Sequence, residues 1–86
     1  MVYLHKVKTD SDRIMCYEYG SEENVYLGKI QFDIDVPKST DFEHRNLKLE
    51  FYNGAEFNRC TSSALQGIAK FVRENKFPDD YLRVTH

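Results

Sequence analysis

The sequence has few of the residues that mark several common functional classes. It contains two cysteines among 86 residues, Cys16 and Cys60, which is too few for a disulfide framework, and their spacing is not that of a metal-binding pair. We therefore expect reduced thiols in a cytoplasmic protein, although one disulfide between the two remains compatible with the sequence. No glycine-rich segment links a strand to a helix, so a phosphate-binding loop is not expected.

Long apolar runs and concentrated positive charge are also absent. No stretch approaches the roughly 20 apolar residues that span a bilayer, and the first residues lack an apolar core of signal-peptide length. The net charge is −2; residues 1–43 carry net −4 and residues 44–86 carry net +2. Duplex nucleic acid is normally bound through a basic patch. We therefore expect neither duplex binding nor a membrane-bound protein.

The composition is that of one small soluble domain covering residues 1–86. Hydrophobic residues make up 41% and charged residues 30%, which is ordinary for a globular protein. A chain of this length buries only about 60–65% of the surface that its unfolded form exposes, so the core is small. Six Phe and six Tyr partly compensate, because each aromatic side chain buries a large area.

The segment Gly28–Val36 is the most regular in the chain. Apolar and polar residues alternate along it, which predicts a strand with one buried and one wet face. The predicted buried side chains are Ile30, Phe32, Ile34 and Val36. Before Gly28 the apolar residues Val25 and Leu27 occupy odd positions, so the phase changes. Either a β-bulge at Gly28 produces this change, or Tyr26 faces inward and its two neighbours lie on the less buried face.

Three more strands and one helix complete the predicted elements. Residues 2–8, 13–19 and 46–52 have strand composition and are separated by polar turns; the buried face of 13–19 is ambiguous because both sets of alternate residues are apolar. Asn53-Gly54 predicts a tight turn, after which residues 55–58 can form a brief strand. A helix is predicted at about 61–75, with Ser63 and Gln66 as its capping box, Thr61 and Ser62 as alternative caps and Asn75 as its C-cap. Residues 81–84 are an edge strand or a packed tail.

These elements predict an α+β fold. We expect an antiparallel sheet of three to five strands in meander order, with the C-terminal helix packed on one face. The predicted core places strand residues Ile30, Phe32, Ile34, Leu47, Leu49 and Phe51 against helix residues Leu65, Ile68, Phe71 and Val72.

The second face of the sheet is the predicted functional surface. Tyr mixed with charged residues is typical of protein-recognition surfaces, and a thin core favours self-association. We therefore expect a protein-interaction module that binds a protein partner or a second copy of itself, with no cofactor and no small-molecule substrate. Its predicted contact residues are Tyr17, Tyr19, Asp33, Asp35, Lys48, Glu50 and Tyr52.

An alternative function is the binding of single-stranded nucleic acid. In that hypothesis bases stack on Tyr52 while Lys70, Arg73 and Lys76 contact phosphate. The carboxylates of Asp33 and Asp35 on the same sheet oppose it, and basic residues in the last turns of a helix also complement its dipole.

A weaker alternative is a small thiol- or metal-dependent enzyme. Cys60 lies near a helix N-terminus, where a thiol pKa can be lowered, but no histidine stands near it in sequence and helix capping is the simpler role for this segment. Asp33 with Asp35, and the loop residues Asp41, Glu43 and His44, are ligand-capable sets without a complete metal motif. We expect no catalytic residue and no metal site.

Overall fold

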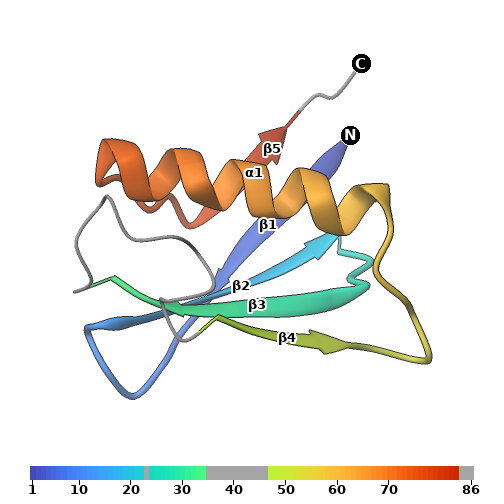
Figure 1. Ribbon diagram of the computed structural model, residues 1–86, viewed down its shortest axis with the longest axis horizontal. Helices are drawn as coiled ribbons and strands as arrows, with labels where there is room; N and C mark the ends of the chain where they lie inside the picture. Colours follow the sequence, from blue (N-terminus) through green and yellow to red (C-terminus); the bar gives the residue numbers. More distant parts are fainter. Residues whose placement is uncertain (23, 35–46, 84–86) are drawn as a thin grey trace.

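A computed structural model describes residues 1–22, 24–34 and 47–83. It contains an antiparallel sheet and one helix packed on one side of it (Figure 1), so the predicted α+β fold is confirmed. The strands are β1 (Val2–Val7), β2 (Ile14–Gly20), β3 (Gly28–Asp33), β4 (Lys48–Phe51) and β5 (Asp80–Arg83), and the helix is α1 (Arg59–Glu74).

The sheet order is β4-β3-β2-β1-β5. The first four strands form the predicted meander, each antiparallel to its neighbour. The chain then crosses one face of the sheet as α1 and returns as β5, which pairs antiparallel with β1 rather than with β4. The possible edge strand predicted at 81–84 is therefore present as β5, which extends the sheet on the side of β1; residue 84 itself lies outside the described residues.

The core lies between the sheet and α1. Ile30 and Phe32 are fully buried on the inner face, the face that α1 covers, against Ile68 and Phe71 of the helix. The remaining predicted core residues pack there too, Val72 buried and the others partly buried: Ile34, Leu47, Leu49, Phe51, Leu65 and Val72. β3 ends at Asp33, and Val36 lies outside the described residues.

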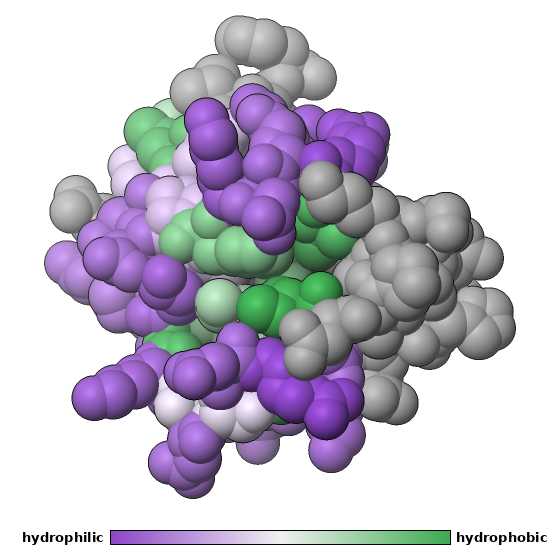
Figure 2. Space-filling view, turned by 90° about the vertical axis from the view of Figure 1, so that its left-hand side faces the viewer, coloured by the Kyte–Doolittle hydropathy of each residue, from purple (hydrophilic) through white to green (hydrophobic). Residues whose placement is uncertain are grey.

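Figure 2 views the molecule from the end at which α1 finishes. Apolar residues form a band at mid-height, with hydrophilic residues above and below it. Partly buried side chains such as Met15 and Phe77 pack against the core cluster without being enclosed by it. The small core therefore reaches the surface at its margin, as expected for a chain of this length.

The phase change before Gly28 has a structural counterpart. Gly28 pairs with Tyr19, yet the Leu27 amide also donates to the Tyr19 carbonyl at 2.7 Å, one residue out of register. Leu27 packs on the core and Gly28 is buried, so two consecutive residues approach the inner side, as at a β-bulge. A Cβ on Gly28 would lie 2.3 Å from the Glu50 carbonyl oxygen, and only glycine fits this approach of β4.

The helix begins two residues earlier than predicted. Its N-cap is Asn58, whose side chain accepts a hydrogen bond from the Thr61 amide at 3.1 Å, while the Asn58 amide donates to Thr61 Oγ1 at 3.2 Å. The predicted capping role of Ser63 is therefore wrong, and residues 55–58 form no strand. At the other end Asn75 caps the helix in the left-handed conformation, φ 54°, as predicted.

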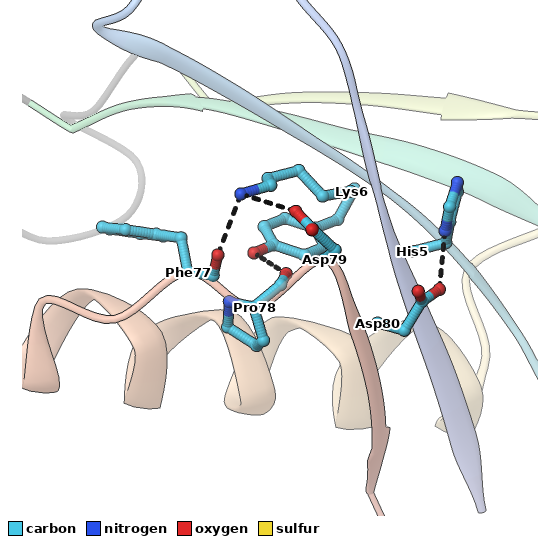
Figure 3. A network of polar contacts seen from close by, with 7 residues as sticks. His5, Lys6, Phe77, Pro78, Asp79 and Asp80 are labelled. Atoms are coloured by element: carbon cyan, nitrogen blue, oxygen red, sulfur yellow. Dashed lines mark hydrogen bonds and ion pairs between the residues drawn. The ribbon is translucent and has the colours of Figure 1, made fainter.

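The connection from α1 to β5 is fastened to the sheet by polar contacts (Figure 3). The Tyr17 hydroxyl donates to the Pro78 carbonyl at 2.7 Å. Lys6 Nζ donates to the Phe77 carbonyl at 2.9 Å and pairs with Asp79 Oδ1 at 3.0 Å. The Lys6 amide also donates to the Asp79 carbonyl at 2.8 Å. These contacts place β5 in register beside β1.

The only helix among the described residues, α1, has 16 residues and does not meet the length and apolarity needed to cross a membrane.

Candidate functional site

The face of the sheet turned away from α1, called the outer face below, carries part of the predicted surface. Lys48 and Glu50 of β4 are exposed on it, and the Tyr52 side chain reaches across it to hydrogen-bond Glu18 of β2. Strand alternation accounts for this placement, because Leu49 and Phe51 point to the core and their neighbours point away. The structure therefore brings together three of the predicted residues, two within β4 and one directly after it.

Two of the predicted contact residues are on the opposite face. Tyr17 and Tyr19 have no exposed surface; Tyr17 donates to Pro78, and the Tyr19 hydroxyl is 2.9 Å from Thr61 Oγ1 of the helix. The prediction that they line the outer face is wrong. In β2 both sets of alternate residues are apolar, and the set with aromatic hydroxyls faces inward because polar partners exist there.

Asp33 is also not available as a contact residue. It lies on the outer side of β3 by strand alternation, but only 2% of its surface is exposed. Its Oδ2 pairs with Arg13 Nη2 at 2.8 Å, and the Ile34 amide donates to the Arg13 carbonyl at 2.8 Å. Asp33 therefore holds the end of β3 to the residue that precedes β2. Its predicted companion, Asp35, lies outside the described residues.

A row of five ionisable residues crosses the outer face, one from each strand. The strand registers pair Asp80 with His5, His5 with Glu18, Glu18 with Lys29, and Lys29 with Glu50. We call these five residues the cross-strand row. With His5 neutral, their charges run acidic, neutral, acidic, basic, acidic, so unlike groups are neighbours in the row. Directly opposed side chains on one face lie about 4.5–5.5 Å apart at Cβ, within interaction range.

The β4 end of the cross-strand row is closely paired. Lys29 Nζ is 3.1 Å from Glu50 Oε2, and the hydrogen bond and charge of that carboxylate raise the pKa of Lys29 above its ordinary value. Tyr52 hydrogen-bonds Glu18; burial, followed by this bond, raises the pKa of the Tyr52 phenol. At neutral pH both groups therefore keep their protons and act as donors toward the row.

The β5 end of the row combines an acid with aromatic rings. His5 Nδ1 is 2.7 Å from Asp80 Oδ1, and Figure 3 shows the two side chains facing each other. The His5 ring stacks against Tyr26 from the β2–β3 connection, with centroids 6.1 Å apart and an interplanar angle of 25°. Tyr3 lies on the same side of β1, two residues before His5. The β5 end of the outer face therefore combines a carboxylate with aromatic rings, whereas the β4 end carries a Lys–Glu ion pair.

The residues proposed for nucleic-acid binding are separated by the thickness of the domain. Tyr52 lies on the outer face, whereas α1, which carries Lys70 and Arg73 and is followed by Lys76, covers the inner face. Lys70 Nζ is 3.5 Å from the Tyr81 hydroxyl and 5.8 Å from the centre of its ring. Tyr52 and these helix residues therefore lie on opposite sides of the sheet.

The two thiols are free, and both have raised pKa values. Cys16 is buried on the outer side of β2, and burial raises its pKa more than nearby Lys29 lowers it. Cys60, in the first turn of α1, has its pKa raised by burial, with the N-terminal ammonium acting in the opposite direction. A nucleophilic cysteine needs the reverse shift. Among the residues that the structure describes, no three His, Cys, Asp or Glu side chains are arranged to hold a metal ion. The loop residues Asp41, Glu43 and His44 lie outside this part of the chain.

The sequence did not predict that Tyr3, His5, Glu18, Tyr26 and Asp80 would lie on the outer face. Glu18 was not predicted because the sequence did not show which face of β2 is buried. With Tyr17 known to be in the core, strand alternation places Glu18 on the outer side. His5 and Asp80 come together through the pairing of β1 with β5, which joins residues 75 positions apart. No local pattern contains that pairing.

Comparisons with protein-family models, with curated proteins and with solved structures find no match for this chain.

Proposed function

We propose that this chain is a small interaction module that binds a protein partner through the outer face of its sheet. The observation that carries the proposal is the cross-strand row: five ionisable side chains, one per strand, on a sheet face that no described element covers. Tyrosines flank the row at both ends, Tyr52 beside β4 and Tyr3 and Tyr26 beside β1. Tyrosine is enriched in protein-recognition surfaces, and the rims of such surfaces are polar.

The size of the outer face fits a small, reversible interface. Five strands spaced by about 4.8 Å give a width of about 19 Å, and six residues at about 3.3 Å give a similar length. The projected area is therefore roughly 400 Å², below the roughly 800 Å² per partner of a standard stable interface. A partner that uses this face alone is expected to bind transiently.

The order of charges in the cross-strand row favours a different protein, rather than a second copy of this chain, as the binding partner. A two-fold axis through the middle of the row and parallel to the strands would set Asp80 opposite Glu50 and Glu18 opposite Glu18. An axis along the row would set every residue opposite itself. Both of the fully overlapping dimers thus place acid against acid, and like charges brought together in an interface cost several kcal/mol. A partner with basic residues avoids this cost.

Site-specific photo-cross-linking tests the proposal. A benzoylphenylalanine in place of Gln31, which pairs with Cys16 and Lys48 in the middle of the outer face, is compared with the same residue in place of Gln66, which is exposed on α1. In cells that express each variant, we expect a discrete adduct of one partner from position 31 only. The adduct should weaken when Glu50→Lys reverses one charge of the row.

Two results would contradict the proposal. Equal adduct patterns from positions 31 and 66 would mean that the outer face is only a solvated surface. A self-adduct of twice the chain mass, together with a dimer in light scattering, would show that the occupant is a second copy.

A further inference from the structure

The outer face is hollowed at the β1–β5 end of the cross-strand row. A cavity of about 380 Å³ opens there, and its lining comes from three separate parts of the chain. β1 contributes Tyr3 and His5, β5 contributes Asp80 and Leu82, and the β2–β3 connection contributes Tyr26 together with Asn24. Asn24 has a left-handed backbone, φ 62°, in the turn that brings this connection back toward the sheet.

The electrostatic character of the cavity is acidic. Among the described residues that line it, none is Lys or Arg, and the Asp80 side chain keeps 78% of its surface exposed. His5 holds one oxygen of this carboxylate at 2.7 Å and stands between Asp80 and Glu18 in the strand register. The Asp80 carboxylate oxygen can only accept in this contact, so His5 Nδ1 is the donor. The carboxylate retains accepting positions for a further donor.

The walls of the cavity are aromatic. Tyr3, His5 and Tyr26 line it, and the last two rings are stacked at 6.1 Å. The face of an aromatic ring attracts a cation, and a nearby carboxylate adds a hydrogen-bonding partner of opposite charge. Among protein side chains arginine meets both demands best, because its planar guanidinium stacks on rings while its N–H groups fork onto a carboxylate.

We propose that this cavity receives an arginine side chain of the protein partner. This inference rests on the proposed function and deepens it, because it names the chemistry that the outer face recognises. The guanidinium lies against the aromatic rings and donates to Asp80, while the rest of the partner covers the cross-strand row. Lysine fits less well because its ammonium is compact, strongly hydrated and unable to stack.

Titration of the ¹⁵N-labelled full chain with blocked tripeptides tests the inference directly. The probes are acetyl-Gly-Arg-Gly-amide, its lysine analogue and its citrulline analogue, which keeps the shape of arginine without the charge. We expect amide shifts concentrated at Tyr3, His5 and Leu82 with the arginine peptide, weaker shifts with lysine and none with citrulline. Asp80→Asn should weaken binding about tenfold, the effect of losing a charge-assisted hydrogen bond.

Two further variants separate recognition from folding. Asp10→Asn makes the same substitution at an exposed acid in the β1–β2 turn and should leave binding unchanged. Tyr26→Leu should weaken binding while leaving the core amides in place. Equal shifts with arginine and citrulline, shifts that survive Asp80→Asn, or no shifts at all would overturn the inference. If the arginine peptide binds but position 31 gives no cross-link, the arginine site is supported and the proposed function is contradicted. If position 31 gives the cross-link but the peptide does not bind, the proposed function is supported and the arginine site is contradicted.

Discussion

We expect the Tyr17 hydroxyl to contribute strongly to the free energy of unfolding. It donates to the Pro78 carbonyl at 2.7 Å from a fully buried ring, so Tyr17→Phe removes the donor and leaves the carbonyl without it. Losing such a partner costs about 1–3 kcal/mol. The whole chain is stabilised by only about 4–13 kcal/mol at 0.05–0.15 kcal/mol per residue. A loss of about 2 kcal/mol should lower Tm by about 8–16 °C.

Urea unfolding followed by circular dichroism measures this loss, with Tyr3→Phe as the matched control. Tyr3 is half-buried on the outer face, and its substitution should change the free energy of unfolding by no more than about 0.5 kcal/mol. If both variants lie within that limit, the Tyr17–Pro78 hydrogen bond does not stabilise the connection from α1 to β5. The slope of the unfolding curve should be unchanged, because the same surface is exposed in each case.

The same residue predicts a loss of stability in alkali. Burial, followed by the charge of Asp79, raises the pKa of Tyr17 above its ordinary value of 10.0. The folded chain therefore keeps the phenolic proton at pH values where the unfolded chain releases it. The stabilisation is fully present below pH 10 and falls as the pH rises above it. Urea midpoints measured from pH 8 to 11 should fall less steeply for Tyr17→Phe; an unchanged slope would contradict this.

Three further experiments test separate parts of the structure. Asn58→Ala should cost about 1 kcal/mol, whereas Ser63→Ala should be neutral or stabilising, since the buried Ser63 hydroxyl has no partner among the described residues; equal losses in urea unfolding would contradict this cap. Gly20→Ala should cost more than about 2 kcal/mol, because a Cβ there would lie 1.8 Å from the Val25 carbonyl oxygen, and a melting temperature close to that of the unsubstituted chain would contradict this packing. Cys60 should react more slowly than free cysteine with a maleimide at pH 7, since burial raises its pKa; faster labelling would revive a catalytic thiol.

Strict alternation made the core strands predictable from the sequence. In β3 and β4 every second residue is apolar, and burial of that set leaves its neighbours on the outer face. β2 was ambiguous because Ile14 and Cys16 are as apolar as Tyr17 and Tyr19. The contacts that decide its orientation, with Pro78 and Thr61, lie 61 and 42 residues away, so no local pattern records them.

The candidate surface was predicted only in part, for a related reason. Lys48, Glu50 and Tyr52 follow from alternation within one strand. Asp33 obeyed the same alternation but is buried by Arg13, 20 residues earlier. The cross-strand row needs four strand registers at once, and a shift of one residue in any of them would remove it.

The pairing of β5 with β1 has a mechanical consequence. Val2 and Arg83 are direct neighbours in the sheet, and the ends of the described chain leave from the same corner of the molecule (Figure 1). A force that separates these two points acts across the strands rather than along them. It would load the β1–β5 hydrogen bonds one after another, beginning at Val2–Arg83, so the domain should unzip at low force when it is pulled from its ends.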